Sequence, residues 1–95
     1  MLRFEIIANN AVEEDIMDEL KKNSADNFFT RLNNVHGCGF SDPKMGDPVW
    51  PEENFMLIIY CSNEEGSAIK SAVNLVRERF PDEGIRCFCI PFEEF

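Results

Sequence analysis

The most apolar stretch of the chain is a run without polar interruption, and this pattern predicts a buried strand. Residues 54–61 read NFMLIIYC, with six apolar residues in succession. A strand with one face in water alternates apolar and polar residues, whereas a continuous apolar run is typical of a strand covered on both faces. A buried helix segment is the alternative, but eight residues are few for a helix, and the β-branched and aromatic side chains favour a strand. The two faces of this central strand are predicted to carry Phe55, Leu57 and Ile59 on one side and Met56, Ile58 and Tyr60 on the other.

Two other segments have apolar residues at helical spacing. Residues 11–23 have acidic side chains in the first turn and two lysines in the last, the polarity that matches the helix dipole. Residues 64–80 follow Asn63, a favourable N-cap, and end before Pro81, which cannot continue a helix. We therefore expect two amphipathic helices. Their apolar stripes consist of Val12, Ile16, Met17 and Leu20 in the first and Ile69, Ala72, Val73, Val76 and Phe80 in the second.

Three more segments have the composition of short strands, namely residues 2–8, 28–39 and 85–90. Asn33 and Asn34 predict a bulge or irregularity in the middle one, and residues 24–27 form a polar break before it. Pro91 is expected to stop the last strand and to begin a short tail. The order strand, helix, strand, strand, helix, strand predicts an α+β fold of the ferredoxin-like βαββαβ type. Such a fold is a four-stranded antiparallel sheet with both helices on one face, here as a single domain over residues 1–95.

A long, irregular connection joins the second and third predicted strands. Residues 40–53 contain one glycine and three prolines, and Gly37 and Gly39 precede them, so no regular element is expected here. Hairpin loops usually have about two to five residues, and longer loops are more often functional or mobile. Lys44 is expected at the loop tip as its only cation, and Trp50 near the base, where it covers a cleft or anchors the return of the chain. The loop is therefore either a recognition element or an ordered spacer pinned by Trp50.

The charge of the chain argues against some classes of partner. Eighteen acidic side chains against nine basic ones give a formal net charge of −9. Such a field repels phosphate backbones and anionic membranes, so neither nucleic acid nor a membrane surface is an expected partner. No apolar run approaches the length of a membrane span and no signal peptide is expected. We therefore expect a cytoplasmic protein with its four cysteines reduced.

The second face of the central strand predicts self-association. Two helices cover only one face of a four-stranded sheet, yet the central strand is apolar on both faces. Ile7, with either Phe88 or Cys87, extends the uncovered patch. A contiguous exposed apolar patch of this kind usually marks an interface. A domain of 95 residues also buries only a modest fraction of its surface, so oligomerisation would add stability.

The order of elements and two stretches of sequence resemble the P-II (PII) signal-transducer superfamily. The stretch VHGCGF…MGD…FMLIIYC resembles the second strand of P-II proteins, its Gly-x-Gly exit and the mobile loop that leads into the third strand. The last third, AIKSAVNLVRERFPDEGIRCFCIPF, is similar to the CutA-type branch. In that branch a helix ends near a proline and feeds a strand that closes with an apolar-Pro pair, here Ile90 and Pro91. The resemblance covers nearly the whole chain.

The resemblance implies a homotrimer with the sheets around the threefold axis, the helices outside, and sites for small molecules or partner proteins in the clefts between subunits. In P-II proteins this cleft binds adenine nucleotides, and the loop reports the bound state to partner proteins. P-II proteins hold phosphates with a glycine-rich, basic loop where residues 81–84 of this chain read PDEG. From the acidity of this turn and of the 40–53 loop, we expect a cationic or neutral ligand, or a basic partner, over a nucleotide.

These considerations select a candidate site and an alternative. The expected ligand-binding residues lie at the base of the loop and within it: His36, Gly37, Cys38, Gly39, Lys44, Gly46 and Trp50. The alternative is a CutA-like protein that binds a metal such as zinc or copper(I) through His36 and Cys38, with or without Cys87 and Cys89. No set of nucleophile, base and orienting residue can be read from the chain, so an enzyme is not expected. The sequence identifies no cofactor.

Overall fold

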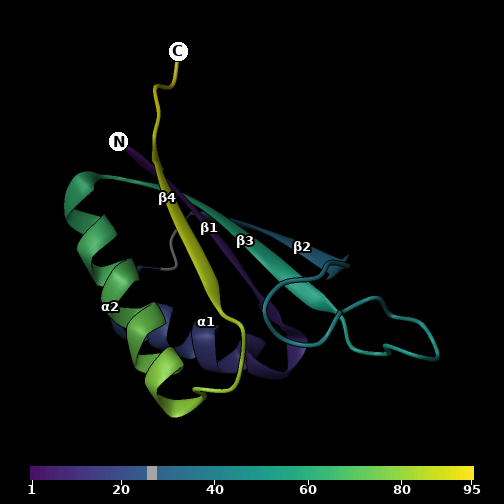
Figure 1. Cartoon of the computed structure of the whole chain (residues 1–95). Coiled ribbons are helices and arrows are strands. Elements are labelled where there is room, and N and C mark those ends of the chain that lie inside the picture. The colour runs from purple at the N-terminus through teal and green to yellow at the C-terminus, as the bar shows by residue number, and fades with distance from the viewer. Residues whose placement is uncertain (26–27) are drawn as a thin grey trace.

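The elements of the chain follow the predicted order in the computed structural model, which describes residues 1–25 and 28–95 (Figure 1). The strands are β1 (Leu2–Asn9), β2 (Phe29–Val35), β3 (Asn54–Cys61) and β4 (Arg86–Pro91). The helices are α1 (Glu13–Lys22), preceded by the 3-10 turn η1 (Asn10–Val12), and α2 (Asn63–Arg79). The polar break expected at 24–27 falls partly outside the described residues. Neither α1 nor α2 has the length and apolar character that a membrane-spanning helix needs.

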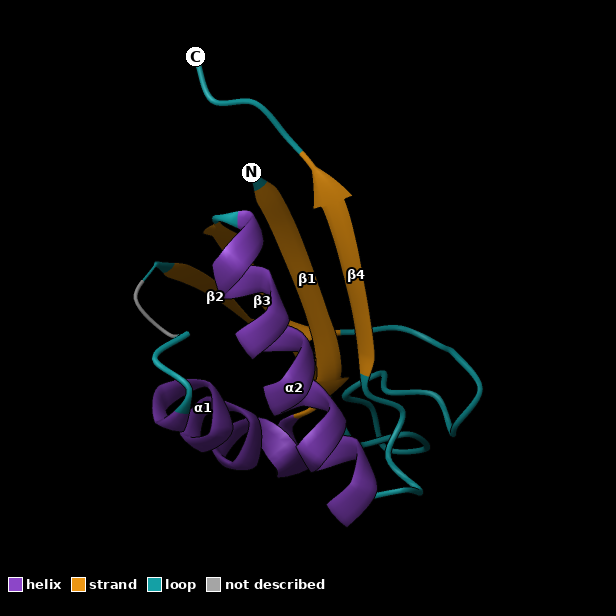
Figure 2. Ribbon diagram, turned by 90° about the vertical axis from the view of Figure 1, so that its left-hand side faces the viewer, coloured by secondary structure: helices purple, strands orange, loops and turns teal. Residues whose placement is uncertain are grey.

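The four strands form one antiparallel sheet in the order β2-β3-β1-β4. β3 is a central strand, since it pairs with β1 over its whole length, from Leu2↔Cys61 to Asn9↔Asn54, and with β2 on its other side. Both helices lie on the same side of this sheet (Figure 2). The predicted ferredoxin-like α+β fold, with residues 54–61 as a central strand, is therefore confirmed.

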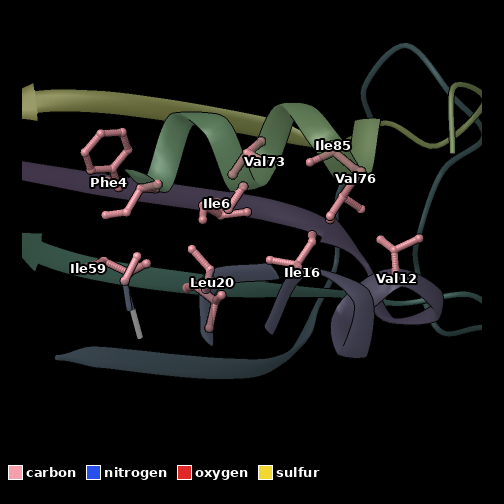
Figure 3. Packing of buried hydrophobic residues seen from close by; sticks show 14 of the residues in the cluster. Phe4, Ile6, Val12, Ile16, Leu20, Ile59, Val73, Val76 and Ile85 are labelled. Carbon is pink, nitrogen blue, oxygen red and sulfur yellow. The ribbon is translucent and has the colours of Figure 1, made fainter. Parts of the chain in front are cut away.

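The core fills the space between the sheet and the helices, with side chains from alternate strand positions and from the helical stripes (Figure 3). The predicted division of β3 into two faces is correct, and the inward face is the one with Phe55 and Leu57, which are fully buried, and Ile59, which is 2% exposed. β1 adds Phe4, which is the register partner of Ile59. On the opposite face of β3, Tyr60 is 43% exposed. Within one chain, the helices therefore cover only the face of β3 that carries Phe55, Leu57 and Ile59, and the face that carries Tyr60 stays open.

The second strand ends earlier than predicted, because Val35 pairs with Asn54, the first residue of β3, and β3 offers no partner beyond it. Asn34 has a left-handed backbone, with φ at 57°, and the register with β3 shifts between Leu32 and Val35. The irregularity expected here is therefore confirmed. β2 stops at Val35, four residues before its predicted end, and Gly37 pairs with a residue of the following loop.

Both helices begin at residues other than the predicted ones, because side chains cap their first turns differently. Before α1, the Asn9 side chain accepts a hydrogen bond from the Ala11 amide at 3.0 Å, and a 3-10 turn precedes the α-helix. Before α2, the N-cap is Ser62 and not Asn63. Ser62 Oγ accepts from the Glu65 amide at 3.2 Å, and the Glu65 carboxylate accepts from the Ser62 amide at 3.2 Å. This reciprocal pair is a capping box.

The last strand begins and ends one residue later than predicted. Pro91 is its final residue, paired with Leu2, and it is tolerated because β4 lies at the edge of the sheet. After it, the amide of Phe92 donates to the Met1 carbonyl at 3.2 Å. The Phe92 ring meets Tyr60 edge to face at 4.9 Å, so the start of the tail covers part of the open face of the sheet.

We expect the Ser62→Ala variant to lose about 1 kcal/mol of unfolding free energy, because the first turn of α2 loses the acceptor of its capping box. The matched variant Asn63→Ala, one residue further on, should change the unfolding free energy by less than about 0.5 kcal/mol. Urea denaturation followed by circular dichroism measures both. Equal losses in the two variants would contradict the assignment of the cap.

Candidate functional site

A pocket of about 390 Å³ opens at the end of the sheet where β1 and β2 finish and β3 and β4 begin. Its walls come from four separate parts of the sequence. They are the end of β1 with Ile7 and Asn9, the end of β2 and the residues after it up to Lys44, the start of β3 with Asn54, and residues between 83 and 88 before and in β4. The antiparallel strand order places these segments at one end of the sheet, so the pocket is a product of the topology.

A backbone pair divides the chain between β2 and β3 into two lobes. The Gly37 amide donates to the Lys44 carbonyl at 2.9 Å, and the Lys44 amide donates to the Gly37 carbonyl at 2.8 Å. We call residues 38–43 the pocket lobe, since most of them line the pocket, and residues 45–52 the outer lobe. The outer lobe is closed by a hydrogen bond from the Gly46 amide to the Glu52 carbonyl, at 3.1 Å, and projects beyond the end of the sheet (Figure 1).

Lys44 lies at the junction of the two lobes, so the prediction that it lies at the loop tip is wrong. It is only 7% exposed, because its backbone pairing with Gly37 draws it inward. Its ammonium donates to the Asp42 carbonyl at 2.6 Å and to Ser41 Oγ at 3.4 Å, and it lies 3.7 Å from the Glu52 carboxylate. The charge of Lys44 therefore holds the pocket lobe to the outer lobe.

His36 and Glu53 tie the two ends of the loop together. The His36 Nε2 and Glu53 Oε2 atoms are 2.6 Å apart. Gly46 packs against this pair with φ at +64°, and a β-carbon at Gly46 would lie 2.8 Å from His36 Nε2. A side chain here would both strain the backbone and collide with the imidazole. Glycine at this position thus lets the outer lobe close on the base of the loop.

Arg86, the first residue of β4, supplies the pocket with a cation that the count of loop charges missed. Its guanidinium carbon lies 5.5 Å from the centroid of the Phe40 ring and 5.4 Å from that of Phe88, within the range of cation–π contact. No carboxylate among the described residues forms an ion pair with Arg86. The order of elements could have indicated Arg86, because a ferredoxin-like sheet places the start of β4 at the same end as the loop.

The pocket brings together five of the seven candidate residues, namely His36, Gly37, Cys38, Gly39 and Lys44. Gly46 and Trp50 belong to the outer lobe instead. The prediction of Trp50 near the loop base is wrong, because Trp50 lies in a turn organised by the Asp47 side chain. The Asp47 carboxylate accepts from the amides of Val49 at 3.0 Å and of Trp50 at 2.6 Å. Trp50 is 39% exposed in this turn.

The two candidate metal ligands on β4 lie on the other side of the sheet. Cys87 and Cys89 are the register partners of Ile6 and Phe4, which are buried under the helices, so both thiols belong to the helix side of β4. Burial raises the pKa of the Cys87 thiol. Across the described residues, no three His, Cys, Asp or Glu side chains gather as a metal site requires. A single chain therefore does not assemble the soft-metal site.

Comparison with known proteins gives matches at the level of three-dimensional structure. No family model and no curated protein matches the chain. CPII from Thiomonas intermedia K12, in a structure bound to ADP and bicarbonate, has a TM-score of 0.73 at 20% identity, over 94% of this chain and 82% of that one. A candidate PII-like signaling protein from Thermus thermophilus has a TM-score of 0.65 at 20% identity, over 94% and 83%. A DUF3240 family protein from Shewanella baltica OS155 has a TM-score of 0.67 at 18% identity, over 99% and 92%.

The chain therefore has the fold of PII-like proteins. The matches extend over nearly all of its length, as the resemblance drawn from the order of elements implied. The structural resemblance to the P-II superfamily is confirmed for the fold. At 18–20% identity the shared property is the fold, and the ligands of those structures belong to those proteins.

We expect the Gly46→Ala variant to open the outer lobe, because a left-handed backbone costs a residue with a β-carbon about 1–2 kcal/mol and the methyl group also meets His36. Hydrogen exchange at the Asp47 amide, which donates to the Trp50 carbonyl at 3.0 Å, should accelerate by about tenfold. The control is Gly39→Ala, where no heavy atom lies within 4 Å of the added carbon. An unchanged exchange rate in Gly46→Ala would show that the outer lobe does not depend on this glycine.

Proposed function

We propose that this chain is a PII-like regulatory protein that binds a small anionic molecule in the pocket at the end of its sheet. The observation that carries the proposal is the arrangement around Arg86, where the pocket lobe meets the start of β4. An anionic group in this pocket would pair with the guanidinium, and a planar ligand would stack on Phe40 or Phe88. ADP and bicarbonate, which the CPII structure binds, are both anions.

The charge of Arg86, at the start of β4, favours this class of ligand over the cationic or neutral one expected from the composition of the loop. Lys44 is already compensated by the Asp42 carbonyl and the Glu52 carboxylate, and His36 is engaged with Glu53. Arg86 has no such compensation from the described residues. It is therefore the group in the pocket that gains most from an incoming anion.

We propose that the outer lobe changes its conformation when a ligand binds and so signals the bound state to a partner protein. A ligand in the pocket touches the pocket lobe, and Lys44 links that lobe to the outer one through Glu52. The outer lobe exposes Val49 at 74% and Trp50 at 39%. Such apolar side chains on a projecting loop suit contact with another protein. Movement of the pocket lobe would thus change the surface offered to the partner.

We further propose that the protein is a cytoplasmic homotrimer that packs through the open face of its sheet. Ile7, Met56 and Ile58 lie half-buried on this face, and Phe88 is 42% exposed beside them. Packing these side chains against other copies of the chain removes apolar surface from water. In this arrangement the pocket, whose lining includes Ile7 and Phe88 of the same face, adjoins the neighbouring subunit. The four cysteines are all free, which suits a reducing compartment.

We expect isothermal titration calorimetry to detect binding of ATP, ADP, AMP or bicarbonate, with the affinity falling about tenfold or more in Arg86→Gln, because a charge-assisted contact is lost. The control is Lys21→Gln, which removes one positive charge from an exposed site at the end of α1. Binding of divalent metals in the absence of any of these anions would favour the CutA-like alternative. If neither anions nor metals bind, the ligand proposal is contradicted and the loop is an ordered spacer.

We expect light scattering to give the mass of three chains for the parent protein and a smaller mass for Ile58→Glu, because a charge buried in an interface without a partner is costly. Ser71→Glu, at an exposed position of α2, adds the same charge on the helix side and should leave the mass unchanged. A stable monomer of the parent protein at micromolar concentration would contradict the proposed assembly.

A further inference from the structure

A second pocket lies on the helix side of the sheet, apart from the proposed ligand site. It has a volume of about 230 Å³ and is lined by residues of α2 and β4, together with Phe4 of β1. α2 runs along this side of the sheet, over β1 and β4 (Figure 3). Because β4 is an edge strand, the pocket borders a free edge of the sheet. It is accessible in the single chain, and packing through the opposite face would leave it so.

Two thiols line this pocket, and they differ in exposure. Cys89 is exposed, whereas Cys87 is half-buried. Burial raises the pKa of the Cys87 thiol, which lowers its share of reactive thiolate. Residues two apart on a strand have α-carbons about 6.4–6.8 Å apart, at the upper limit for a disulfide, so Cys87 is poorly placed to pair with Cys89. Cys89 is therefore the thiol that a reagent in solution meets.

The charges that line this pocket are opposite to those of the chain as a whole. The chain has 18 acidic and 9 basic side chains, yet the described residues lining the pocket include Lys70 and Arg77 and no acidic one. Arg77 is held in place, since its Nε and Nη2 donate to the Ile85 carbonyl at 3.2 and 3.1 Å. Its Nη1 donates to Asn74 Oδ1 at 3.2 Å. A fixed and an exposed cation thus share one pocket with Cys89.

We propose that Cys89 is a site of reversible thiolation by small anionic disulfides, with glutathione disulfide as the reagent of this class. The Cys89 thiolate attacks one sulfur of the reagent and the S–S bond of the reagent breaks. A mixed disulfide forms at Cys89, and one glutathione leaves as a thiolate, which takes up the proton that Cys89 lost. Carboxylates of the bound glutathionyl group pair with Lys70 and Arg77, and these pairs favour an anionic over a cationic disulfide. The inference is independent of the proposed ligand site.

The experiment compares two reagents of opposite charge on the folded protein at one pH. Glutathione disulfide is anionic and cystamine is cationic, and both deliver a thiol by the same exchange reaction. Intact-mass spectrometry of acid-quenched samples measures the extent of reaction, and peptide mapping assigns the modified cysteine. Cys38, the other exposed thiol, is mapped separately and is not the reference, because its pocket also contains Arg86. The reference is Cys89 in the same protein unfolded in urea, where the pocket beside α2 is lost.

We expect the rate of Cys89 modification in the folded protein, relative to that in the urea-unfolded protein, to be roughly threefold or more higher with glutathione disulfide than with cystamine. High salt should remove most of this difference, because the attraction acts between exposed charges. Lys70→Gln should slow the reaction of Cys89 with glutathione disulfide but not with cystamine. Lys21→Gln, with the same loss of charge outside the pocket, should react like the parent protein.

Either of two results would overturn the proposal. One is an equal ratio of folded to unfolded rates with both reagents, which would show that the fold gives Cys89 exposure and no preference for an anionic reagent. The other is a Lys70→Gln variant that reacts with glutathione disulfide at the parental rate, which would show that the charge of Lys70 does not attract the reagent. Because Lys70 is exposed on α2, this variant retains the core, and circular dichroism verifies that it is folded.

Discussion

The full-length antiparallel pairing of β1 with β3 is the constraint on which the rest of the structure depends. It runs without a register shift from Leu2↔Cys61 to Asn9↔Asn54. The register places the inward side chains of both strands on one face, under the helices, and a slip by one residue would turn them all to the other face. Because β2 and β4 add to the two sides of this pair, the end of β2 and the start of β4 lie at the same end of the sheet. The pocket can form only there.

The loop after β2 is organised by contacts that it makes with itself. A backbone pair, an imidazole–carboxylate contact and a buried lysine hold its two lobes together. Two of the four carboxylates of the loop are used in these contacts, since Glu52 and Glu53 face Lys44 and His36. The charge of a segment therefore does not by itself define the charge that a ligand meets. In this pocket the cation without an ion pair among the described residues, Arg86, comes from a different part of the chain.

β4 presents different chemistry on its two faces, because its side chains alternate. Arg86 and Phe88 face the pocket at the end of the open side of the sheet. Cys87 and Cys89 face the helix side and line the smaller pocket beside α2. The edge position of β4 gives both sets access to solvent that a central strand would deny them. One strand of six residues thus contributes to a ligand pocket and to a thiol pocket.

The sequence by itself determined the order of elements, the division of β3 into two faces and the irregularity in β2, because each depends on local periodicity or on the backbone preferences of a few adjacent residues. It also indicated most of the pocket residues after β2. Only the tertiary structure decided that Lys44 is buried, that Trp50 lies in the outer lobe and that Arg86 joins the pocket. These outcomes depend on contacts between distant segments, such as Arg86 with Phe40, or on pairing within an irregular loop, as between Gly37 and Lys44. Neither kind of contact leaves a periodic pattern, so no local reading of the chain reveals it.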